Sequence, residues 1–543
     1  MPTLKASRLG IVRIKQARNQ RGWGWSIDDD DTCLVKASQM IEPNIIWYSG
    51  GPYAKGISEG TWKRFLAGRQ PISATAFKAY CQVLELNWEE IVDRRSGESV
   101  NTRQDWGEAI DTSIFYGRTV ELEHLQEWIV IQHTRLVALL GMGGIGKTAL
   151  AVKLGEQIQQ SFDCLIWRSL RHGPPVSDIL ADLIEFLSDG QVAELPKTIN
   201  GRVSILMDQL QQKRCLILLD DFETVLRSGE LAGNYKESYQ GYGELIRRVG
   251  EERHQSCLLL IGREKPIEIS SLAGATLPVR ELKLKGLGLE DAKQLLVTKG
   301  FTHLKRGVED LIQLYRGNPL ALKLMATTIQ EIFDGNISEF LDQSTLIIGD
   351  ILPGILDQQF ERFSDLEKEI VYYLAIENQP ITLSELRLNM QFSVSSVSEL
   401  LAALESLKRR SLLEKEPSSK GNEAVFTIEP VIAKYVTNQF IEQVCKDIWT
   451  ACQTRLTSKI GLLRSHALAN KQDRDEVKVL QIRLLLKRIV ERLYMNVKGT
   501  NSLETQLKDL LSILEEDSPQ AVGYGIANIS NLLATIAGKV DLY

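Results

Sequence analysis

The stretch Leu136–Leu150, LVALLGMGGIGKTAL, decides the fold. Five apolar residues lead straight into Gly141, and the run closes with Gly146, Lys147 and Thr148, which completes the pattern G-x-x-x-x-G-K-T. This pattern predicts a phosphate-binding loop between a strand and a helix, because glycines leave the backbone amides free to face phosphate oxygens and the helix adds its positive N-terminal end. We expect Lys147 to reach the β- and γ-phosphates of a nucleotide and Thr148 to ligate Mg²⁺.

Apolar runs that alternate with helix-length segments surround this loop. They are RLVALLG, CLIWRSL, CLILLDD and CLLLIGR, which begin at Arg135, Cys164, Cys215 and Cys257. Such alternation is typical of a parallel sheet flanked by helices. The sequence therefore predicts an α/β nucleotide-binding domain over residues 114–277.

Polar residues end two of these predicted strands. Asp220 and Asp221 end CLILLDD. One carboxylate there can hold Mg²⁺ and the second can polarise an attacking water, while the alternative is that the pair only caps the next helix. Arg263 ends CLLLIGR at the sheet edge where open α/β sheets bind ligands, so it can sense a γ-phosphate or be a solvated loop arginine. We predict Asp220, Asp221 and Arg263 as catalytic residues and Thr148 and Asp220 as metal ligands.

The composition is that of a globular protein. The 543 residues are 43% hydrophobic and 25% charged, with a formal net charge of −6. At roughly 100–200 residues per domain, about three to five domains are expected. No apolar run reaches the roughly 18 residues of a membrane span and no signal-peptide core opens the chain, so we expect a cytoplasmic protein. The seven cysteines include no C-x-x-C pair and fit neither a disulfide framework nor a zinc ribbon.

The rest of the chain is predicted to be largely helical. A polar stretch before the nucleotide-binding domain resembles a linker. After that domain the pattern is helical, with one break, EKEPSSKGNEAVFTI from Glu414 to Ile428, that suggests a two-stranded wing. We expect an N-terminal all-α domain, a linker, the nucleotide-binding domain, a helical subdomain, a winged helix and a C-terminal helical region, over 1–95, 96–113, 114–277, 278–355, 356–440 and 441–543.

The order of motifs resembles the NB-ARC type of STAND-class P-loop NTPases. The matching segments are FYGR, GMGGIGKT, LILLDD, LLLIGRE, LKGLGLEDAKQLL and YRGNPLALKLMA, in that order. The resemblance implies that ATP or ADP binds with Mg²⁺, that Tyr116 and Arg118 lie on the adenine side, and that Pro319 is presented to the adenine. The nucleotide-contacting residues implied are Tyr116, Gly117, Arg118, Gly141, Gly143, Gly144, Ile145, Gly146, Lys147, Thr148, Ala149, Gly317, Pro319 and Leu320.

One position departs from the family pattern. The family holds ADP with a His-Asp pair just after the wing, and here that position is Glu429-Pro430. Two like charges about 4 Å apart repel by roughly 4 kcal/mol at an effective dielectric of 20. A charged Glu429 beside the β-phosphate therefore cannot be the contact that holds ADP. We expect its carboxylate to turn away, to be protonated, or to pair with a cation such as Lys434 or Mg²⁺.

The N-terminal region resembles a lambda-repressor-like helix-turn-helix. RIKQARNQRGWGWS matches its first helix and ISEGTWKRFLAGRQPISATAFKAYCQVLELNWEEIV its later ones, with an insertion of about 30 residues between them. Ser58, Thr61, Trp62 and Lys63 hold positions that would face a DNA groove, although Trp62 and Phe65 suit a core equally well. Basic residues that can neutralise phosphates precede the first acidic residue, namely Lys5, Arg8, Arg13, Lys15, Arg18 and Arg21.

Two readings follow for the function. We favour a slow ATPase switch with a closed ADP form and an ATP form that opens and self-associates, with a sensor or effector protein in trans as a further partner. The alternative is a DNA-binding transcription regulator controlled by ATP. For the winged helix, Lys408, Arg409 and Arg410 would favour DNA, but a basic helix end more often satisfies its own dipole. In bacterial relatives a helical segment of this kind tends to precede a long sensor array, often a WD-repeat propeller. No repeat of 20 to 50 residues is visible here, so we expect that the chain is naturally short, that it is truncated, or that a separate protein supplies the sensing part.

Overall fold

The computed structural model describes most of the chain. The described residues are 3–21, 27–68, 70–92, 102–192, 194–301, 307–342, 351–377, 379–390, 396–417, 423–468, 476–496 and 503–538. They form two compact units, one from Met1–Arg103, Leu125–His133 and Ile158–Asp163, and the other from the remaining chain. No described helix has the length and apolar content needed to cross a membrane.

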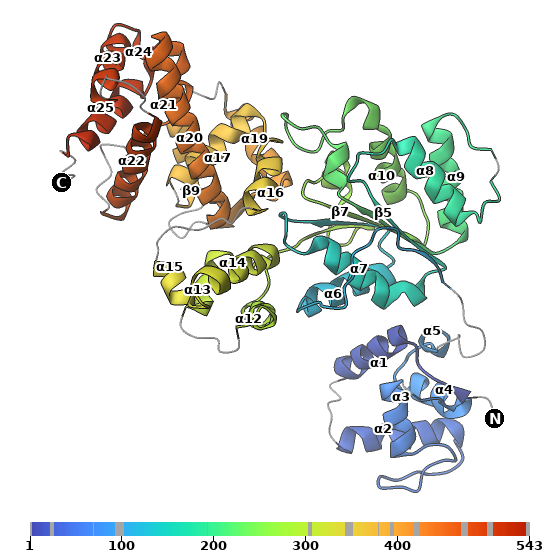
Figure 1. The fold of residues 1–543 in the computed structure, drawn as a ribbon. Helices are drawn as coiled ribbons and strands as arrows, with labels where there is room; N and C mark the ends of the chain where they lie inside the picture. Colours follow the sequence, from blue (N-terminus) through green and yellow to red (C-terminus); the bar gives the residue numbers. More distant parts are fainter. Residues whose placement is uncertain are drawn as a thin grey trace. The chain divides into compact units, whose positions relative to one another are not determined.

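A six-stranded sheet forms the centre of the larger unit (Figure 1). Its order is β3-β5-β6-β7-β4-β8, and the pairs from β5 to β8 are parallel. The strands are β3 (Arg103–Asp105), β4 (Leu136–Leu140), β5 (Cys164–Ser169), β6 (Cys215–Asp220), β7 (Cys257–Gly262) and β8 (Val279–Lys283). Strands β4, β6 and β7 are buried along their whole length, which explains why they are nearly continuous apolar runs in the sequence. The predicted α/β class is confirmed.

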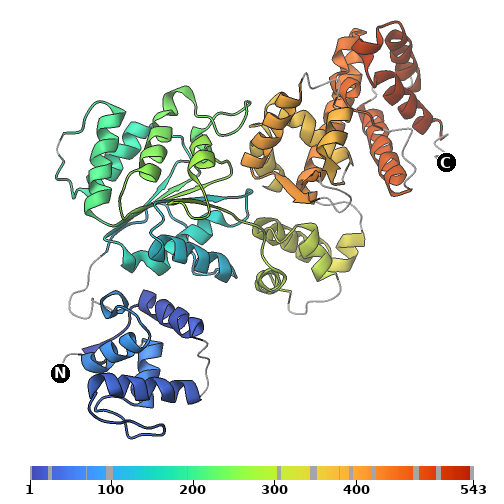
Figure 2. The same cartoon turned by 180° about the vertical axis from the view of Figure 1, so that it is seen from behind.

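Helices cover both faces of the sheet, as the views from the front and from behind agree (Figures 1 and 2). Helix α7 (Lys147–Ile158) lies on one face. Helices α8 (Val176–Leu187), α9 (Ile199–Gln212) and α10 (Gly241–Glu251) lie on the other. In α8 the buried residues recur every three or four positions and join the core of that face, which is the spacing of an amphipathic helix. Shorter helices are α6 (Thr119–Gln126), a π-helical segment (Glu127–Ile131), the 3₁₀ segments Gln159–Ser161 and Glu237–Tyr239, and α11 (Ile267–Leu272).

Two edge strands correct the expected boundaries. Arg103–Asp105, inside the stretch expected to be a linker, is strand β3, and Val279–Lys283, inside the expected helical subdomain, is strand β8. Both are short, and much of their surface stays exposed, so neither carries an apolar run that marks a buried strand. Residues 96–101 of the expected linker lie outside the described residues.

Helices follow the sheet, in a helical subdomain and a winged helix. The first set is α12 (Leu289–Thr298), α13 (Val308–Leu314), α14 (Pro319–Ile332), α15 (Ile337–Asp342) and α16 (Ile351–Phe360). The second set is α17 (Asp365–Glu377), β9 (Ile381–Thr382), α18 (Leu383–Asn389), α19 (Val397–Arg409), β10 (Leu413–Pro417) and β11 (Ala424–Ile428). Strands β10 and β11 are the antiparallel pair expected for the wing, and β9 adds a third short strand beside β11.

A single long helix crosses the boundary expected at residue 440. Helix α20 runs unbroken over 25 residues, Pro430–Thr454, because its buried apolar positions continue to Ala451 with no internal glycine or proline. The C-terminal leucine-rich segments are helices, as predicted. After α20 the chain forms a 3₁₀ segment (Thr457–Lys459), α21 (Gly461–Ser465), α22 (Glu476–Asn496), α23 (Leu503–Glu515), α24 (Pro519–Val522) and α25 (Gly525–Ile536).

The N-terminal helices differ from the expected helix-turn-helix in one element. They are α1 (Arg8–Gln20), α2 (Ile27–Ile41), α3 (Glu59–Ala67), α4 (Ala74–Val83) and α5 (Trp88–Ile91), beside the short pair β1 (Thr3–Leu4) and β2 (Ile72–Ser73). Helix α2 occupies part of the segment expected to be an insertion, and residues 22–26 of the first-helix motif lie outside the described residues.

The side chains of α3 are used within its own fold. Trp62 and Phe65 are core residues with ring centroids 5.5 Å apart, so the alternative of core anchors is the correct one. Ser58 and Thr61 form a capping box at the start of the helix, and Thr61 Oγ1 lies 2.8 Å from Tyr80 Oη. Lys63 pairs with Glu59 one turn away.

Candidate nucleotide-binding site

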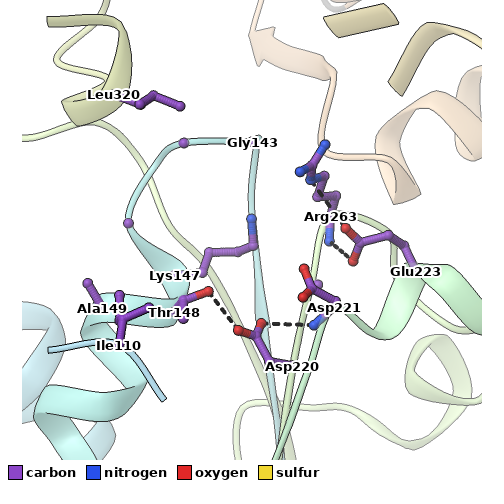
Figure 3. A pocket seen from close by; sticks show the side chains of 13 residues that line it. Ile110, Gly143, Lys147, Thr148, Ala149, Asp220, Asp221, Glu223, Arg263 and Leu320 are labelled. Atoms are coloured by element: carbon purple, nitrogen blue, oxygen red, sulfur yellow. Dashed lines mark hydrogen bonds and ion pairs between the residues drawn. The ribbon is translucent and has the colours of Figure 1, made fainter. Parts of the chain in front are cut away.

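A cavity of about 240 Å³ lies where strands β4, β6 and β7 end (Figure 3). Strand β7 stands between the strand that leads into the phosphate loop and the strand that ends at Asp220. The side chains that follow these three strands therefore meet at one edge of the sheet. The cavity is lined by Ile110, Gly143, Gly144, Gly146, Lys147, Thr148, Ala149, Asp220, Asp221, Glu223, Gly262, Arg263 and Leu320.

The phosphate loop has the backbone that its glycines permit. Gly144 and Gly146 have φ of +74° and +96°, in the left-handed region that favours glycine. A Cβ at Gly144 would lie 2.7 Å from Leu320 Cβ, so the glycine also allows the close approach of α14. Lys147 Nζ donates to the carbonyls of Gly141 and Met142, each at 2.9 Å. Burial lowers the pKa of Lys147 to about 8, so a bound phosphate anion would favour its charged form.

Asp220 and Thr148 form an oxygen-only pair on the floor of the cavity. Thr148 Oγ1 donates to Asp220 Oδ2 at 2.8 Å, and Asp220 Oδ1 accepts the backbone N–H of Asp221 at 2.9 Å. Burial and the neighbouring Asp221 raise the pKa of Asp220 to about 6. A hydroxyl beside a buried carboxylate is the donor set that Mg²⁺ prefers when phosphates complete its coordination, so these residues fit the expected metal.

Asp221 is held by an unusual backbone conformation. Its φ of +56° is left-handed, and it turns the chain from β6 into the 3₁₀ segment η3 (Phe222–Val225). Its side chain makes no cap to that segment, and Asp221 Oδ2 accepts from Ser169 Oγ at 3.2 Å. A capping role is therefore wrong for Asp221, and its carboxylate lines the cavity.

Arg263 is paired with a residue that the sequence did not single out. Its backbone N–H donates to Glu223 Oε2 at 3.0 Å, and its Nε lies 3.2 Å from Glu223 Oε1. Figure 3 shows this pair on one side of the cavity, with Gly143 and Lys147 on the other. Arg263 is thus a cavity residue and not a solvated loop arginine.

The start of α14 touches the phosphate loop directly. Asn318 caps the helix by accepting from the N–H groups of Leu320 and Ala321, and its Nδ2 donates to Gly143 O at 3.2 Å. The N–H of Leu320 donates to Gly144 O at 3.3 Å. Asn318 could have been found from the sequence, because an asparagine before a proline is a common helix start.

The residues expected on the adenine side do not line this cavity. Arg118 is buried and supports the loop, with Nη2 donating to Ile145 O at 3.0 Å and Nη1 pairing with Glu121 at 2.8 Å. Tyr116 packs against the core of the following helices. Contact with adenine therefore stays a prediction. The predicted residues outside the lining of the cavity are Tyr116, Gly117, Arg118, Gly141, Ile145, Gly317 and Pro319.

Glu429 also lies outside the lining of the cavity. It stands at the start of α20 without capping it, and the charges that act on it belong to Glu414, Arg316 and Lys283. Burial and Glu414 raise the pKa of Glu429 to about 7, and the two cations oppose this rise. Of the three expected outcomes for this carboxylate, the raised pKa favours protonation. The cations that act on Glu429 are Arg316 and Lys283 and not Lys434, and Arg316 pairs with Glu414.

A buried charge network joins the residue after Arg263 to the winged helix. Glu264 Oε2 accepts from Arg410 Nη1 at 2.7 Å and from Arg362 Nη2 at 2.9 Å. Arg410 Nε also donates to Glu367 Oε1 at 2.9 Å. Glu264 and Arg410 are 2% exposed and Glu367 is fully buried, so each charge depends on its partners for solvation.

Hydrogen bonds along one loop extend this network. The N–H of Ala232 donates to Ser406 Oγ at 2.6 Å, and the N–H of Gly229 donates to Arg362 O at 2.9 Å. Next to the network, the N–H of Lys265 donates to Arg409 O at 2.9 Å. The side chains of Arg409 and Arg410 at the end of α19 are also bonded within the protein, Arg409 to Ala232 O and Glu405 and Arg410 to the network.

These features define the nucleotide-binding part of the chain as a P-loop NTPase fold of the α/β class. Within that class, residues 118–232 match the NB-ARC domain family, which confirms the resemblance for this stretch.

The chain is similar to larger proteins. An uncharacterized WD repeat-containing protein of Nostoc sp. is 43% identical over 98% of this chain and 45% of its own length. The disease resistance protein RGA2 of Solanum bulbocastanum is 24% identical over 44% of this chain and 24% of its own length. The chain thus spans less than half the length of these relatives. A solved STAND protein with a tetratricopeptide repeat sensor from Pyrococcus horikoshii is 17% identical, with 80% of this chain and 60% of that chain covered and a TM-score of 0.33.

Proposed function

We propose that the chain is a STAND-type nucleotide-dependent signalling switch that binds ATP or ADP with Mg²⁺ and hydrolyses ATP slowly. The observation that carries this proposal is that other parts of the chain bond to both sides of the cavity. Asn318 and Leu320 at the start of α14 contact the phosphate loop, and Glu264, next to Arg263, pairs with Arg410 of the winged helix. A change at the γ-phosphate would therefore act on both contacts.

Slow turnover fits a switch, because each state must persist. We assign Asp220 to the metal ion and Asp221 to the attacking water. The magnesium ion, when bound by Thr148 and Asp220, would neutralise the charge of the phosphates. Asp221→Asn should keep ATP binding and lower hydrolysis by about 100-fold, since asparagine tolerates the left-handed backbone but cannot accept a proton. Equal turnover in the variant and the wild type would move this role to another residue.

Self-association in the ATP state is the second part of the proposal. The mass of the full chain should be measured in solution with ADP and with a non-hydrolysable ATP analogue. We expect a monomer with ADP and a larger species with the analogue, and one mass under both conditions would overturn this part. A sensor or effector protein acting in trans completes the scheme.

A transcription regulator controlled by ATP is the alternative, and the ion pairs argue against it. Three of the basic residues expected to neutralise DNA phosphates have acidic partners, Arg13 with Glu90, Arg18 with Asp30 and Arg21 with Glu85. Arg410 of the winged helix is buried in the charge network. Adding DNA to the mass measurements tests this alternative, which requires a complex that weakens steeply as salt rises.

A further inference from the structure

Glu223 holds Arg263 at two points. One carboxylate oxygen accepts the backbone N–H of Arg263 at 3.0 Å, and the other lies 3.2 Å from its side-chain Nε. A carboxylate that contacts the backbone and the side chain of the same residue restricts the rotamers of that residue. Within the described part of the chain, the two terminal amino groups of Arg263 have no hydrogen-bond partner, so they remain available to a ligand.

The position of Glu223 is itself fixed by its neighbours. The left-handed Asp221 starts the 3₁₀ turn, and Phe222 is 1% exposed and packs edge-on against Tyr242 with ring centroids 5.8 Å apart. Gly262 leaves the space that the carboxylate uses, since a Cβ there would lie 3.1 Å from Glu223 Oε2. The side chain of Glu223 is 10% exposed. The geometry is therefore set before any ligand binds.

The pair also faces the phosphate loop. Figure 3 places Arg263 and Glu223 across the cavity from Lys147, and both charges act on the Lys147 ammonium. Lys147 and the glycine loop suffice to hold the β-phosphate. A third phosphate would extend from there toward the opposite wall, where the terminal amino groups of Arg263 are free.

We propose that Glu223 is the positioning residue that lets this site distinguish a nucleoside triphosphate from a diphosphate, because it fixes Arg263 for the γ-phosphate. The proposal deepens the switch function and rests on it. A simple charge argument makes the opposite prediction. If Glu223 acted only as a negative charge near the phosphates, its removal would favour the more highly charged triphosphate.

The test measures the dissociation constants of ADP and of a non-hydrolysable ATP analogue, both with Mg²⁺, by calorimetry on the full chain. In Glu223→Ala we expect the preference for the triphosphate to fall by about tenfold, the size of one charge-assisted hydrogen bond. Glu223→Gln, which keeps an acceptor for the backbone N–H, should fold as the wild type and show a smaller fall. In an Arg263→Ala background, Glu223→Ala should cause no further fall, because Glu223 acts through Arg263.

Glu252→Ala is the matched control, since it removes a carboxylate that pairs with an arginine, Arg248, outside the lining of the cavity. Its preference for the triphosphate should match that of the wild type. An unchanged or increased preference in Glu223→Ala and Glu223→Gln would overturn the inference. If Lys147→Ala still loses ADP in that case, the proposed function stands. Nucleotide binding that Lys147→Ala leaves intact would overturn both.

Discussion

The phosphate loop and the buried charge network are two regions that meet at the dipeptide Arg263-Glu264, because Arg263 lines the cavity and Glu264 belongs to the network. The two regions differ in how the sequence encodes them. The loop is a local motif in which Gly141 to Thr148 are consecutive. The network joins residues far apart in the chain, since Glu264 and Arg410 are 146 positions apart and Arg410 and Glu367 are 43 apart. A local motif can be read because its chemistry needs a fixed order of residue types, whereas each member of the network is an ordinary charged residue in the sequence.

The two regions should also fail differently when they are altered. Lys147 and Thr148 of the loop should contribute to ligand binding, whereas Met142 of the same loop packs in the core. The network should stabilise the attachment of the winged helix to the nucleotide-binding domain. It should make no direct contribution to phosphate affinity. Substitutions in each region can test this separation.

The largest effect is expected in the network. Arg410→Met leaves Glu264 and Glu367 buried without their shared cation, which should weaken the attachment of the winged helix by about 3–5 kcal/mol. The N–H groups of Gly229, Ala232 and Lys265 donate to residues of α19 or of the segment just before α17. Amide hydrogen exchange at these three residues should therefore accelerate by about 100-fold or more. Arg247→Met is the control, because Arg247 is 48% exposed and solvent screens its ion pairs on α10, so their loss should have little effect. Similar exchange rates in both variants would mean that the network does not stabilise the attachment of the winged helix.

The next effect is expected in the loop. Lys147→Ala removes the main cation for the β- and γ-phosphates, so ADP affinity measured by calorimetry should fall about 100-fold, or about 2.7 kcal/mol. Without nucleotide, amide exchange at Gly229 and Ala232 should match the wild type. Lys153→Ala on the same helix, where Lys153 pairs with Glu156, should leave affinity unchanged. Faster exchange at those amides would break the separation of the two regions.

The smallest effect is expected at Glu429, which belongs neither to the lining of the cavity nor to the ion pairs of the network. Its pKa is about 7 in the folded chain against an ordinary 4.5, so the folded chain holds this proton more tightly than the unfolded chain. The free energy of unfolding should therefore fall as pH rises from about 4.5 through about 7. Glu429→Gln should gain about 1–2 kcal/mol over the wild type between pH 5 and pH 8, a discounted figure because the side chain is only partly buried.

Urea unfolding at a series of pH values measures this gain. Exposed Glu251 gives the control variant, Glu251→Gln, which should run parallel to the wild type. A gain of equal size at every pH would show that the Glu429 carboxylate does not titrate in this range.

The sequence predicted those parts of the site that depend on backbone chemistry. The glycine loop, Lys147, Thr148, Asp220 and Asp221 could be read because strand, turn and helix follow one another. Glu223 could not, because its role depends on a left-handed turn at Asp221 and on the missing Cβ of Gly262 in another strand. Asn318 was missed although its motif was quoted, since its contact with Gly143 spans 175 positions.

The fold was predictable to the same extent. Buried strands such as β6 and β7 carry apolar runs, so they were found, and the exposed edge strands β3 and β8 were not. The expected insertion in the N-terminal domain contains helix α2. The first half of this helix includes four consecutive aspartates, which interrupt the apolar periodicity by which a helix is recognised in a sequence.

Helix α20 has a mechanical consequence. Its 25 residues begin at the wing and continue into the C-terminal helices, which at 1.5 Å per residue makes a rod of about 37 Å. A tilt of about 10° at its first turn would carry its last turn by about 6 Å, about half the width of a helix. Side chains lose contact beyond about 4.5 Å, so this lever would convert a small rocking of the winged helix into a complete change of neighbours at its far end.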